Sequence, residues 1–280
     1  MTPLREKMIL AMQMRGFSPR THSSYLAGVT GLAKHFGCSP EIINTTQLNH
    51  YFEYLVTERQ LAPASCLLHL NSIRFLYIQV LKRPSLELDI KLPKRPQKIP
   101  ELLTLSEVAR LLKACENPKH RMALTLCYGC GLRLSELASL KVSDIDGERH
   151  LLRVEQGKGA KDRLVPVSGS LLGLLREYWR LYRPGPWLFC GRGDGPMSVA
   201  TPQRAYRRSK ARAGLLKRGG IHALRHAYAT HQLEAGLPVH RLQYLLGHRS
   251  IQSTLRYVHW VPSMADRGAQ FDLIARLDHD

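Results

Sequence analysis

A short segment of unusual composition divides the sequence into two parts. Residues 91–100, KLPKRPQKIP, contain three prolines and four basic residues and show no helical spacing of apolar side chains. Proline lacks a backbone N–H group and restrains the residue before it, so such a segment is expected to be extended and semi-rigid. We predict a basic linker over residues 91–103. Its side chains Lys91, Lys94 and Arg95 can lie along a polyanion or remain in water.

Residues 1–90, before this linker, have the apolar spacing of amphipathic helices. Ser18 and Pro19 are residue types favoured at the cap and the first position of a helix, and Gly37 is typical of a helix end. Four helices with short connections predict a small bundle. They are expected at residues 1–14, 18–36, 47–59 and 63–83.

Residues 104–280 are expected to form a second, mostly helical domain. Thr104 and Glu107 form a capping box before an apolar helix. Further on, the Leu- and Val-rich segments LLRVEQ and DRLVPV flank a turn at 157–161, which predicts a β-hairpin. The sequence therefore indicates a mainly α fold with a small β-sheet in its second part. Helices are expected there at residues 108–114, 120–128, 134–140, 171–181, 201–213 and 240–246.

The chain of 280 residues is strongly basic. It has 41 Lys and Arg against 22 Asp and Glu, a formal net charge of +19. Such an excess indicates a polyanionic partner, with nucleic acid ahead of an anionic membrane surface. No apolar run approaches the roughly 18 residues of a membrane span, and the N-terminus lacks a signal-peptide core. We therefore expect a cytoplasmic, nucleoid-associated protein with no membrane partner.

Basic residues outside the linker are further candidates for contacts with DNA. The helix expected at 201–213 is rich in arginine and could lie in a major groove, although a solvated face would have the same composition. Another lysine lies in the turn of the expected hairpin. The candidates are Lys161, Arg204, Arg207, Arg208 and Lys210.

The sequence offers little support for a metal or a cofactor. Cys127 and Cys130 have CxxC spacing, but no second CxxC or CxxH pair lies nearby and the segment is apolar, so two buried thiols are the better interpretation. Lys158 lies between two glycines, yet the GxxxxGK[ST] pattern of nucleotide-binding loops is absent. We expect no metal site and no cofactor.

Residues 221–259 hold side chains suited to phosphate chemistry. His222 and Arg225 are three positions apart and share one face of a helix. His248 follows the glycine that ends the next expected helix, and Tyr257 lies nine residues further on. Arginine grips phosphate oxygens bidentately, and tyrosine can serve as a covalent nucleophile.

Two basic side chains from earlier in the chain complete this set. Arg133 follows a glycine-rich turn and lies near the start of a helix, where backbone N–H groups favour an anion. Lys158 lies in the hairpin turn, and its flanking glycines allow the backbone to approach a ligand closely.

This ordered set of residues resembles the tyrosine recombinases, the integrase family of phages, integrons and bacterial Xer proteins. The matching motifs are GLRLSEL, GKGAKDRLVPV, HALRHAYATH and LLGHRSIQSTLRYVH, and the pattern Ser18-x-x-Thr21-x-x-x-Tyr25 resembles the family's N-terminal core-binding domain. The interval from the lysine to the His-x-x-Arg motif lacks the extra residues of integron integrases, so a Xer-like or transposon-associated recombinase is the closer match. The family's six catalytic positions correspond to Arg133, Lys158, His222, Arg225, His248 and Tyr257.

The resemblance implies a site-specific recombinase that needs no metal. Tyr257 would attack a DNA phosphate to give a 3′-phosphotyrosine, while Arg133 and Arg225 clamp the phosphate oxygens. Lys158 would protonate the leaving 5′-oxygen. The two histidines have supporting roles: His222 would help to accept the tyrosine proton, and His248 would hydrogen-bond the phosphate.

The resemblance also implies partners and leaves two alternatives open. The expected partners are double-stranded recombination sites and either a homo-tetramer on two duplexes or a paralogous recombinase. A type IB topoisomerase would use the same cleavage chemistry without joining duplexes, and a DNA-binding protein with a silent active site would not cleave. An apolar stripe of Phe271, Ile274 and Leu277 predicts a terminal helix that docks on a neighbouring subunit.

Overall fold

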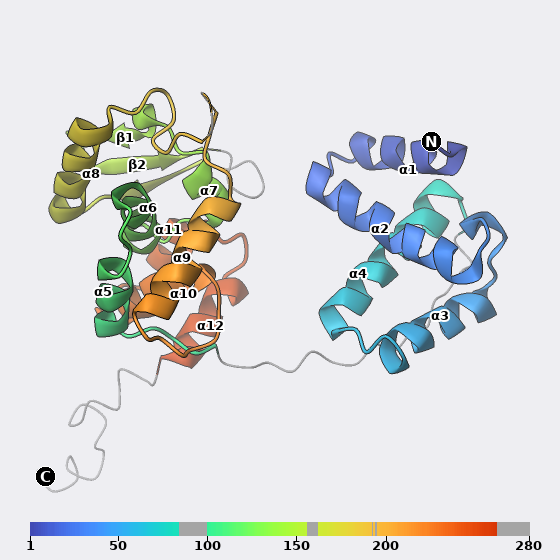
Figure 1. Cartoon of the computed structure of the whole chain (residues 1–280). Helices are drawn as coiled ribbons and strands as arrows, with labels where there is room; N and C mark the ends of the chain where they lie inside the picture. Colours follow the sequence, from blue (N-terminus) through green and yellow to red (C-terminus); the bar gives the residue numbers. More distant parts are fainter. Residues whose placement is uncertain (84–99, 156–161, 192, 194, 262–280) are drawn as a thin grey trace, which may run out of the picture. The chain divides into compact units, whose positions relative to one another are not determined.

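The chain folds into two units, each of which surrounds its own hydrophobic core (Figure 1). A computed structural model describes residues 1–83, 100–155, 162–191, 193 and 195–261. The N-terminal unit ends at Lys98, and the C-terminal unit begins at Ile99. The prediction of a mainly α fold with a small β-sheet is confirmed.

The N-terminal unit is a helical bundle in which α2 packs on α4. Buried side chains such as Leu32, Leu48 and Ile73 form its core. Ser18 caps α2 by accepting a hydrogen bond from the backbone of Thr21, and Gly37 ends that helix in the left-handed region. The helices are α1 (Pro3–Met14), α2 (Pro19–Phe36), α3 (Thr45–Thr57) and α4 (Pro63–Arg74), with a 3-10 turn η1 (Pro40–Ile42) before α3.

The last helix of this unit differs from the uninterrupted helix expected to residue 83. After Arg74 the backbone widens into a π-helix, η2 (Phe75–Val80). Phe75, Leu76 and Tyr77 are all buried. The smaller rotation per residue of a π-helix brings three consecutive side chains toward one core, which a period of 3.6 residues does not predict.

The C-terminal unit places helices around a three-stranded antiparallel sheet of order β1-β2-β3. Leu152 of β2 pairs with Ile145 of β1 and with Val165 of β3. The helices are α5 (Leu105–Lys113), α6 (Pro118–Gly129), α7 (Leu134–Ala138), α8 (Gly169–Tyr182), α9 (Ala200–Arg212), α10 (His222–Glu234), α11 (Val239–Leu246) and α12 (Gln252–Trp260), with a 3-10 turn η3 (Val142–Asp144); the strands are β1 (Ile145–Asp146), β2 (Leu151–Val154) and β3 (Arg163–Pro166).

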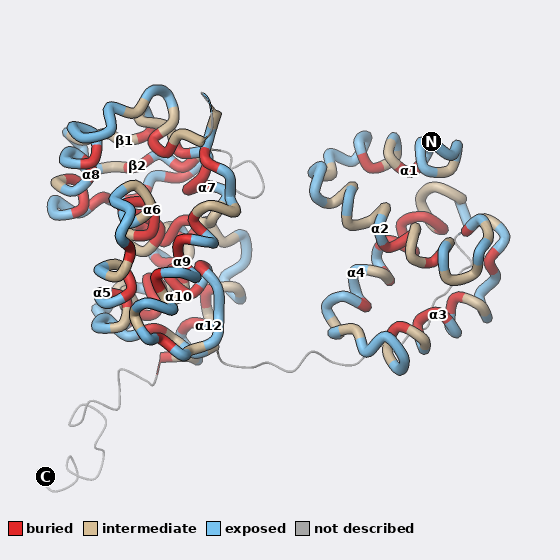
Figure 2. Tube along the Cα trace, viewed as in Figure 1, coloured by how far each residue is buried: buried red, intermediate tan, exposed pale blue. Residues whose placement is uncertain are grey.

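Helix α10 is largely buried, with eight of its 13 residues in the interior of this unit (Figure 2). It packs against α6, α11 and α12. Its small side chains, including Ala227 and Ala229, are fully buried and allow the neighbouring helices to approach closely. A helix fixed on several sides holds its polar side chains in defined positions, and α10 begins at His222.

Several sequence predictions are confirmed by local structure. Thr104 and Glu107 form the expected capping box at the start of α5. Cys127 and Cys130 are buried, and burial raises the pKa of both thiols to about 12, which disfavours reactive thiolates. No helix among the described residues is both long and apolar enough to cross a membrane.

Other predicted residues lie outside the described ranges. These are the linker candidates, the lysines of the hairpin turn and the terminal apolar stripe: Lys91, Lys94, Arg95, Lys158, Lys161, Phe271, Ile274 and Leu277.

Candidate active site

Arg133 is positioned by a tight turn between α6 and α7. Gly131 has φ +58°, and a Cβ atom at that position would lie 2.4 Å from the ring of Tyr228, so only glycine fits. The turn makes Arg133 the N-cap residue of α7. Its Nη1 donates to Glu136 Oε1 and its Nη2 to the carbonyl of Gly247, each over 2.7 Å.

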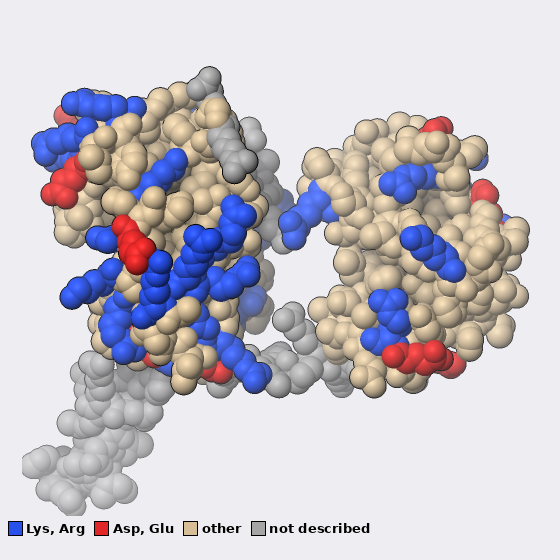
Figure 3. All heavy atoms as spheres, viewed as in Figure 1, with Lys and Arg blue, Asp and Glu red and all other residues tan. Residues whose placement is uncertain are grey.

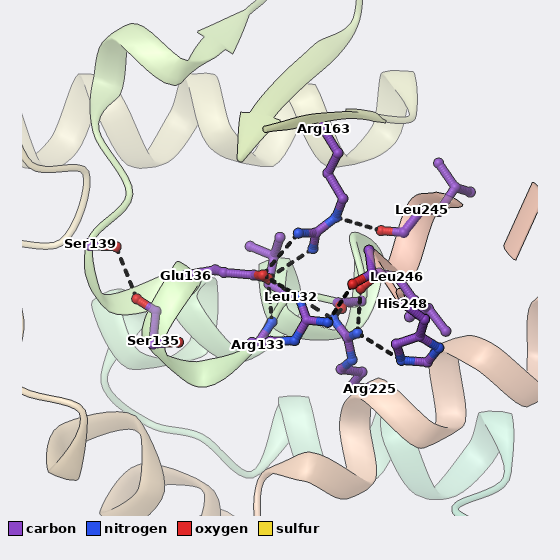
Figure 4. A network of polar contacts seen from close by, with 12 residues as sticks. Leu132, Arg133, Ser135, Glu136, Ser139, Arg163, Arg225, Leu245, Leu246 and His248 are labelled. Carbon is purple, nitrogen blue, oxygen red and sulfur yellow. Dashed lines mark hydrogen bonds and ion pairs between the residues drawn. The ribbon is translucent and has the colours of Figure 1, made fainter. Parts of the chain in front are cut away.

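Glu136 is the common partner of three arginines (Figure 4). Arg163, on β3, forms a bidentate pair with it, with both N–O distances 2.8 Å. Arg225 Nη1 lies 4.0 Å from Glu136 Oε2. Burial alone would raise the pKa of Glu136, but hydrogen bonds and charge from Arg163 and Arg133 lower it to about 2. The carboxylate is therefore ionised and offsets part of the positive charge.

Arg225 extends from α10 into the space between the turn and α11. Its Nη1 donates to the carbonyl of Gly131 over 2.6 Å, and its Nη2 donates to the carbonyl of Leu246 over 2.5 Å. Burial and the charge of Arg133 lower its pKa to about 10, so it remains protonated at neutral pH. Two backbone carbonyls thus fix a buried cation beside Arg133.

His248 contacts the same guanidinium from the end of α11. Arg225 Nη2 lies 3.2 Å from His248 Nε2, and His248 Nδ1 lies 2.9 Å from Thr254 Oγ1. A guanidinium can only donate, so Nε2 accepts and the ring proton lies on Nδ1. Burial, reinforced by the charge of Arg225, lowers the pKa of His248 to about 4 and keeps it neutral.

Tyr257 of α12 is buried against these groups. Its ring lies parallel to that of His248, at a centroid distance of 6.2 Å, and Trp260 packs edge-on at 5.1 Å. Its hydroxyl lies 3.0 Å from Nδ1 of His226. Burial raises the pKa of Tyr257, whereas the positive charges of Arg225 and Arg256 oppose that rise. The phenol is therefore protonated at neutral pH and next to a cationic centre.

The structure brings four of the six predicted catalytic residues together from distant parts of the chain: Arg133, Arg225, His248 and Tyr257. His222 is the first residue of α10 and is exposed, one turn before His226. The two other tyrosines of residues 221–259, Tyr228 and Tyr244, are placed differently from Tyr257. Tyr228 packs under the glycine turn, and Tyr244 is 55% exposed.

Basic side chains also gather on the face of the C-terminal unit that carries α9 (Figure 3). Arg204, Arg207 and Arg208 are exposed, and Lys210 is half-buried. Arg212 on the same helix is paired with Glu116 over 2.8 Å. Three predicted DNA-contacting arginines of α9 are therefore accessible to a ligand.

Four residues that shape the site were not among the predicted site residues. They are partners that only the fold brings together, although two had a signal in the sequence. Arg163 occupies an inward-facing position of an alternating strand, where a buried charge requires a partner. His226 follows Arg225 directly. The four residues are Glu136, Arg163, His226 and Thr254.

Comparison with known proteins shows which family the chain resembles. The phage integrase family profile matches residues 101–263, and the profile of the phage integrase N-terminal SAM-like domain matches residues 4–87. The protein y4qK of Sinorhizobium fredii, named as an integrase/recombinase, is 41% identical over 279 residues, which cover 99% of this chain and 91% of that protein. A tyrosine recombinase of Pseudothermotoga lettingae is 30% identical over 279 residues, covering 95% of this chain and 94% of that protein.

A solved structure shows the same fold. The lambda integrase dimer bound to a COC′ core site matches with a TM-score of 0.73 at 22% identity, over 89% of this chain and 94% of that chain. The family profile covers more than half of the sequence, and the relatives span nearly its full length. The chain therefore belongs to the phage integrase family, the tyrosine recombinases.

Proposed function

We propose that Tyr257 is the nucleophile with which this tyrosine-type, site-specific recombinase cleaves and rejoins DNA. The observation that supports the proposal best is that side chains from α10, from α12 and from the end of α11 lie in contact. Arg225 of α10 lies 3.2 Å from His248, and Tyr257 of α12 stacks on the same imidazole. A phosphate at the two arginines would lie beside the phenol.

The proposed reaction needs only groups of the protein and the DNA. The oxygen of Tyr257 bonds to phosphorus, and the bond from phosphorus to the 5′-oxygen breaks. Arg133 and Arg225 stabilise the charge that builds on the non-bridging oxygens. Because the phosphodiester energy is kept in the 3′-phosphotyrosine, a 5′-hydroxyl of a partner strand can reverse the step and exchange strands.

The remaining catalytic positions complete the proton transfers in this scheme. Lys158 protonates the leaving 5′-oxygen, and His248, held neutral between Arg225 and Thr254, hydrogen-bonds the phosphate. His222, exposed at the start of α10, faces solvent where DNA can approach and assists at the tyrosine.

The proposed partners follow from this chemistry. The substrate is a pair of double-stranded recombination sites, and the assembly is a tetramer of this chain on two duplexes or a complex with a paralogous recombinase. The related lambda integrase is a dimer on its core site. Residues proposed to contact DNA include those of α9 and the basic linker. The proposed location is the cytoplasm, at the nucleoid.

A nicked suicide substrate tests the role of Tyr257. Diffusion of the short 5′-fragment should trap the wild-type protein on the 3′ end of the DNA, and peptide mapping should identify Tyr257. Tyr257→Phe keeps the ring and its packing on His248, so it should bind DNA normally and form no adduct. An adduct on Tyr228, Tyr244 or any other residue rejects the assignment.

A strand-joining assay separates this function from its two alternatives. A recombinase joins two differently labelled duplexes, whereas a type IB topoisomerase relaxes supercoiled plasmid without joining them. A silent DNA-binding protein gives neither product and no covalent adduct.

A further inference from the structure

We infer that His226 is the group that accepts the proton of Tyr257 when this hydroxyl attacks DNA, an assignment that rests on the proposed function of Tyr257. His226 lies in the second turn of α10 and faces α12. Its Nδ1 atom is 3.0 Å from the hydroxyl oxygen of Tyr257. This distance allows direct proton transfer without an intervening water.

The second partner of the phenol determines where its proton points. The Arg225 guanidinium also acts on Tyr257, where its positive charge opposes the rise that burial causes in the pKa of the phenol. A guanidinium has donors and no acceptor, so it cannot take the phenol proton. The phenol proton is then free to be donated to His226 Nδ1, which accepts it in the tautomer that carries its own proton on Nε2.

His248, the other imidazole that contacts the ring of Tyr257, is less suited to this role. His248 stacks on Tyr257, but its Nε2 accepts from Arg225 and its Nδ1 carries the proton shared with Thr254. Neither nitrogen is free to accept the phenol proton. In the described part of the chain, His226 is the imidazole whose nitrogen lies within hydrogen-bonding distance of the Tyr257 hydroxyl.

Trp260 holds the two reacting side chains in this arrangement. Its ring packs edge-on against His226 at 5.6 Å and against Tyr257 at 5.1 Å. Tyr257 is only 3% exposed. Bulk water therefore has little access to the phenol proton, and a fixed acceptor is needed.

The charge of the surroundings makes the transfer depend on DNA. Burial, with the charges of His222, Arg225 and Arg256, lowers the pKa of His226 to about 4, so the imidazole is neutral and able to accept. The same burial raises the pKa of Tyr257. A phosphate between the arginines offsets their positive charge and makes the imidazole more basic. The nucleophile is then activated at the moment the substrate is in place.

The step balances with the groups already named. The Tyr257 oxygen bonds to phosphorus as its proton moves to His226 Nδ1, and the 5′-oxygen leaves with a proton from the general acid. During religation the imidazolium returns its proton to the phenol oxygen, while the incoming 5′-hydroxyl loses one.

Two substitutions at this position separate proton transfer from orientation. His226→Ala removes both the hydrogen bond and the base, whereas His226→Asn places an amide oxygen near Nδ1 that can accept a hydrogen bond but no proton. Both variants should bind DNA normally and form the covalent adduct about 10²–10⁴-fold more slowly. His231→Asn is the matched control, because His231 of the same helix lies away from the site: its Nδ1 accepts from the Tyr128 hydroxyl over 2.9 Å, and its Nε2 donates to the carbonyl of Leu103. It should keep the wild-type cleavage rate.

Chemical rescue assigns the missing proton to the nucleophile. A fluorinated tyrosine at position 257, with a more acidic phenol, should restore much of the rate lost in His226→Asn and little of that lost in Lys158→Ala. A 5′-bridging phosphorothiolate, which leaves without protonation, should do the reverse. A misfolded variant would regain activity with neither the fluorinated tyrosine nor the phosphorothiolate. Selective rescue therefore shows that His226 takes part in proton transfer and does not only support the fold.

The outcomes distinguish this inference from the proposed function. Wild-type rate in His226→Asn, failure of the fluorinated tyrosine to rescue it, or rescue by the phosphorothiolate overturns the role of His226 while Tyr257 remains the mapped nucleophile. An adduct that maps to another residue instead overturns the proposed function itself.

Discussion

At the scale of single residues, one buried carboxylate holds the arginines of the proposed active site together. Glu136 has 4% of its side chain exposed and contacts Arg133, Arg163 and Arg225. Three guanidiniums packed this closely would repel one another in a low-dielectric interior without it. Glu136 touches none of the proposed reacting atoms, and its role is to position the groups that do.

Replacing this carboxylate should therefore affect both stability and cleavage. Glu136→Gln keeps the shape but leaves buried guanidiniums without a counter-charge, so it should lower the free energy of unfolding by about 3–5 kcal/mol. Adduct formation should also slow, because Arg133 loses its anchor. Glu155→Gln is the control, since Glu155 pairs with Lys141 and Arg153 near the surface, where water screens the charges, and its loss should change stability far less. Chemical denaturation of both variants measures the difference; equal losses contradict the role of Glu136.

Because the pKa of Glu136 is lowered in the folded state, the stability of the protein should depend on pH. The folded state lowers the pKa of Glu136 from 4.5 to about 2. The resulting stabilisation, about 3 kcal/mol, is fully present above pH 4.5 and is lost as the pH falls toward 2. The difference in the free energy of unfolding between the wild-type protein and Glu136→Gln should therefore shrink as the pH falls from 4.5 toward 2. Chemical denaturation at a series of pH values measures this difference. A difference that does not change with pH contradicts the prediction.

The sequence predicted the residue types of the site better than their partners. His222 and Arg225, three apart on α10, and His248 after a helix end lie where spacing and the glycine signal put them. The contact between Glu136 and Arg163 joins an early helix to a strand 27 positions later, and no local pattern encodes such a pair. The bond between His226 and Tyr257 likewise depends on how α10 packs on α12.

At the scale of elements, α9 is the clearest candidate for contact with the DNA backbone. Arg204, Arg207 and Arg208 are exposed on it, whereas Arg212 is held by Glu116. Each phosphate contact releases counterions, so the logarithm of affinity should fall with the logarithm of salt with a slope near −0.9 per contact.

Single substitutions on α9 should change this slope. Arg207→Ala should weaken DNA binding and reduce the salt slope by about one unit, with little effect on sequence preference. Arg180→Ala removes the same charge from an exposed position on α8 and should leave the slope unchanged. Binding titrations over a range of salt concentrations test both, and an unchanged slope in Arg207→Ala places α9 away from the DNA.

The ends of helices could be predicted where a particular residue type caps or stops the helix. The capping box at Thr104 and the left-handed Gly37 and Gly247 mark helix ends that the sequence indicated. Strand β1, of two residues, is too short to show an alternating pattern. The π-helix after Arg74 was not predicted either, because its three consecutive buried side chains do not follow the period of 3.6 residues.

At the scale of the whole molecule, each unit is stabilised by its own core, and the positive charge is a property of the complete chain. The N-terminal core centres on residues such as Leu32 and Tyr51, and the C-terminal core on residues such as Leu124 and Leu224. A net charge of +19 is more than solubility requires and suits a protein that acts on polyanionic DNA.

We expect the terminal residues to control the proposed assembly on two duplexes. Phe271, Ile274 and Leu277 recur at three-residue spacing, the pattern of an apolar helix face, and we expect this face to dock on a neighbouring subunit. Truncation after Pro262 should therefore leave the binding of one protein to one site intact and abolish the joining of two labelled duplexes. Ile274→Asp should act like the truncation, whereas Asp272→Ala, off the apolar stripe, should not. Gel analysis of synaptic complexes measures the effect, and a truncated protein that still recombines shows that the terminal segment packs on its own subunit or has no role in assembly.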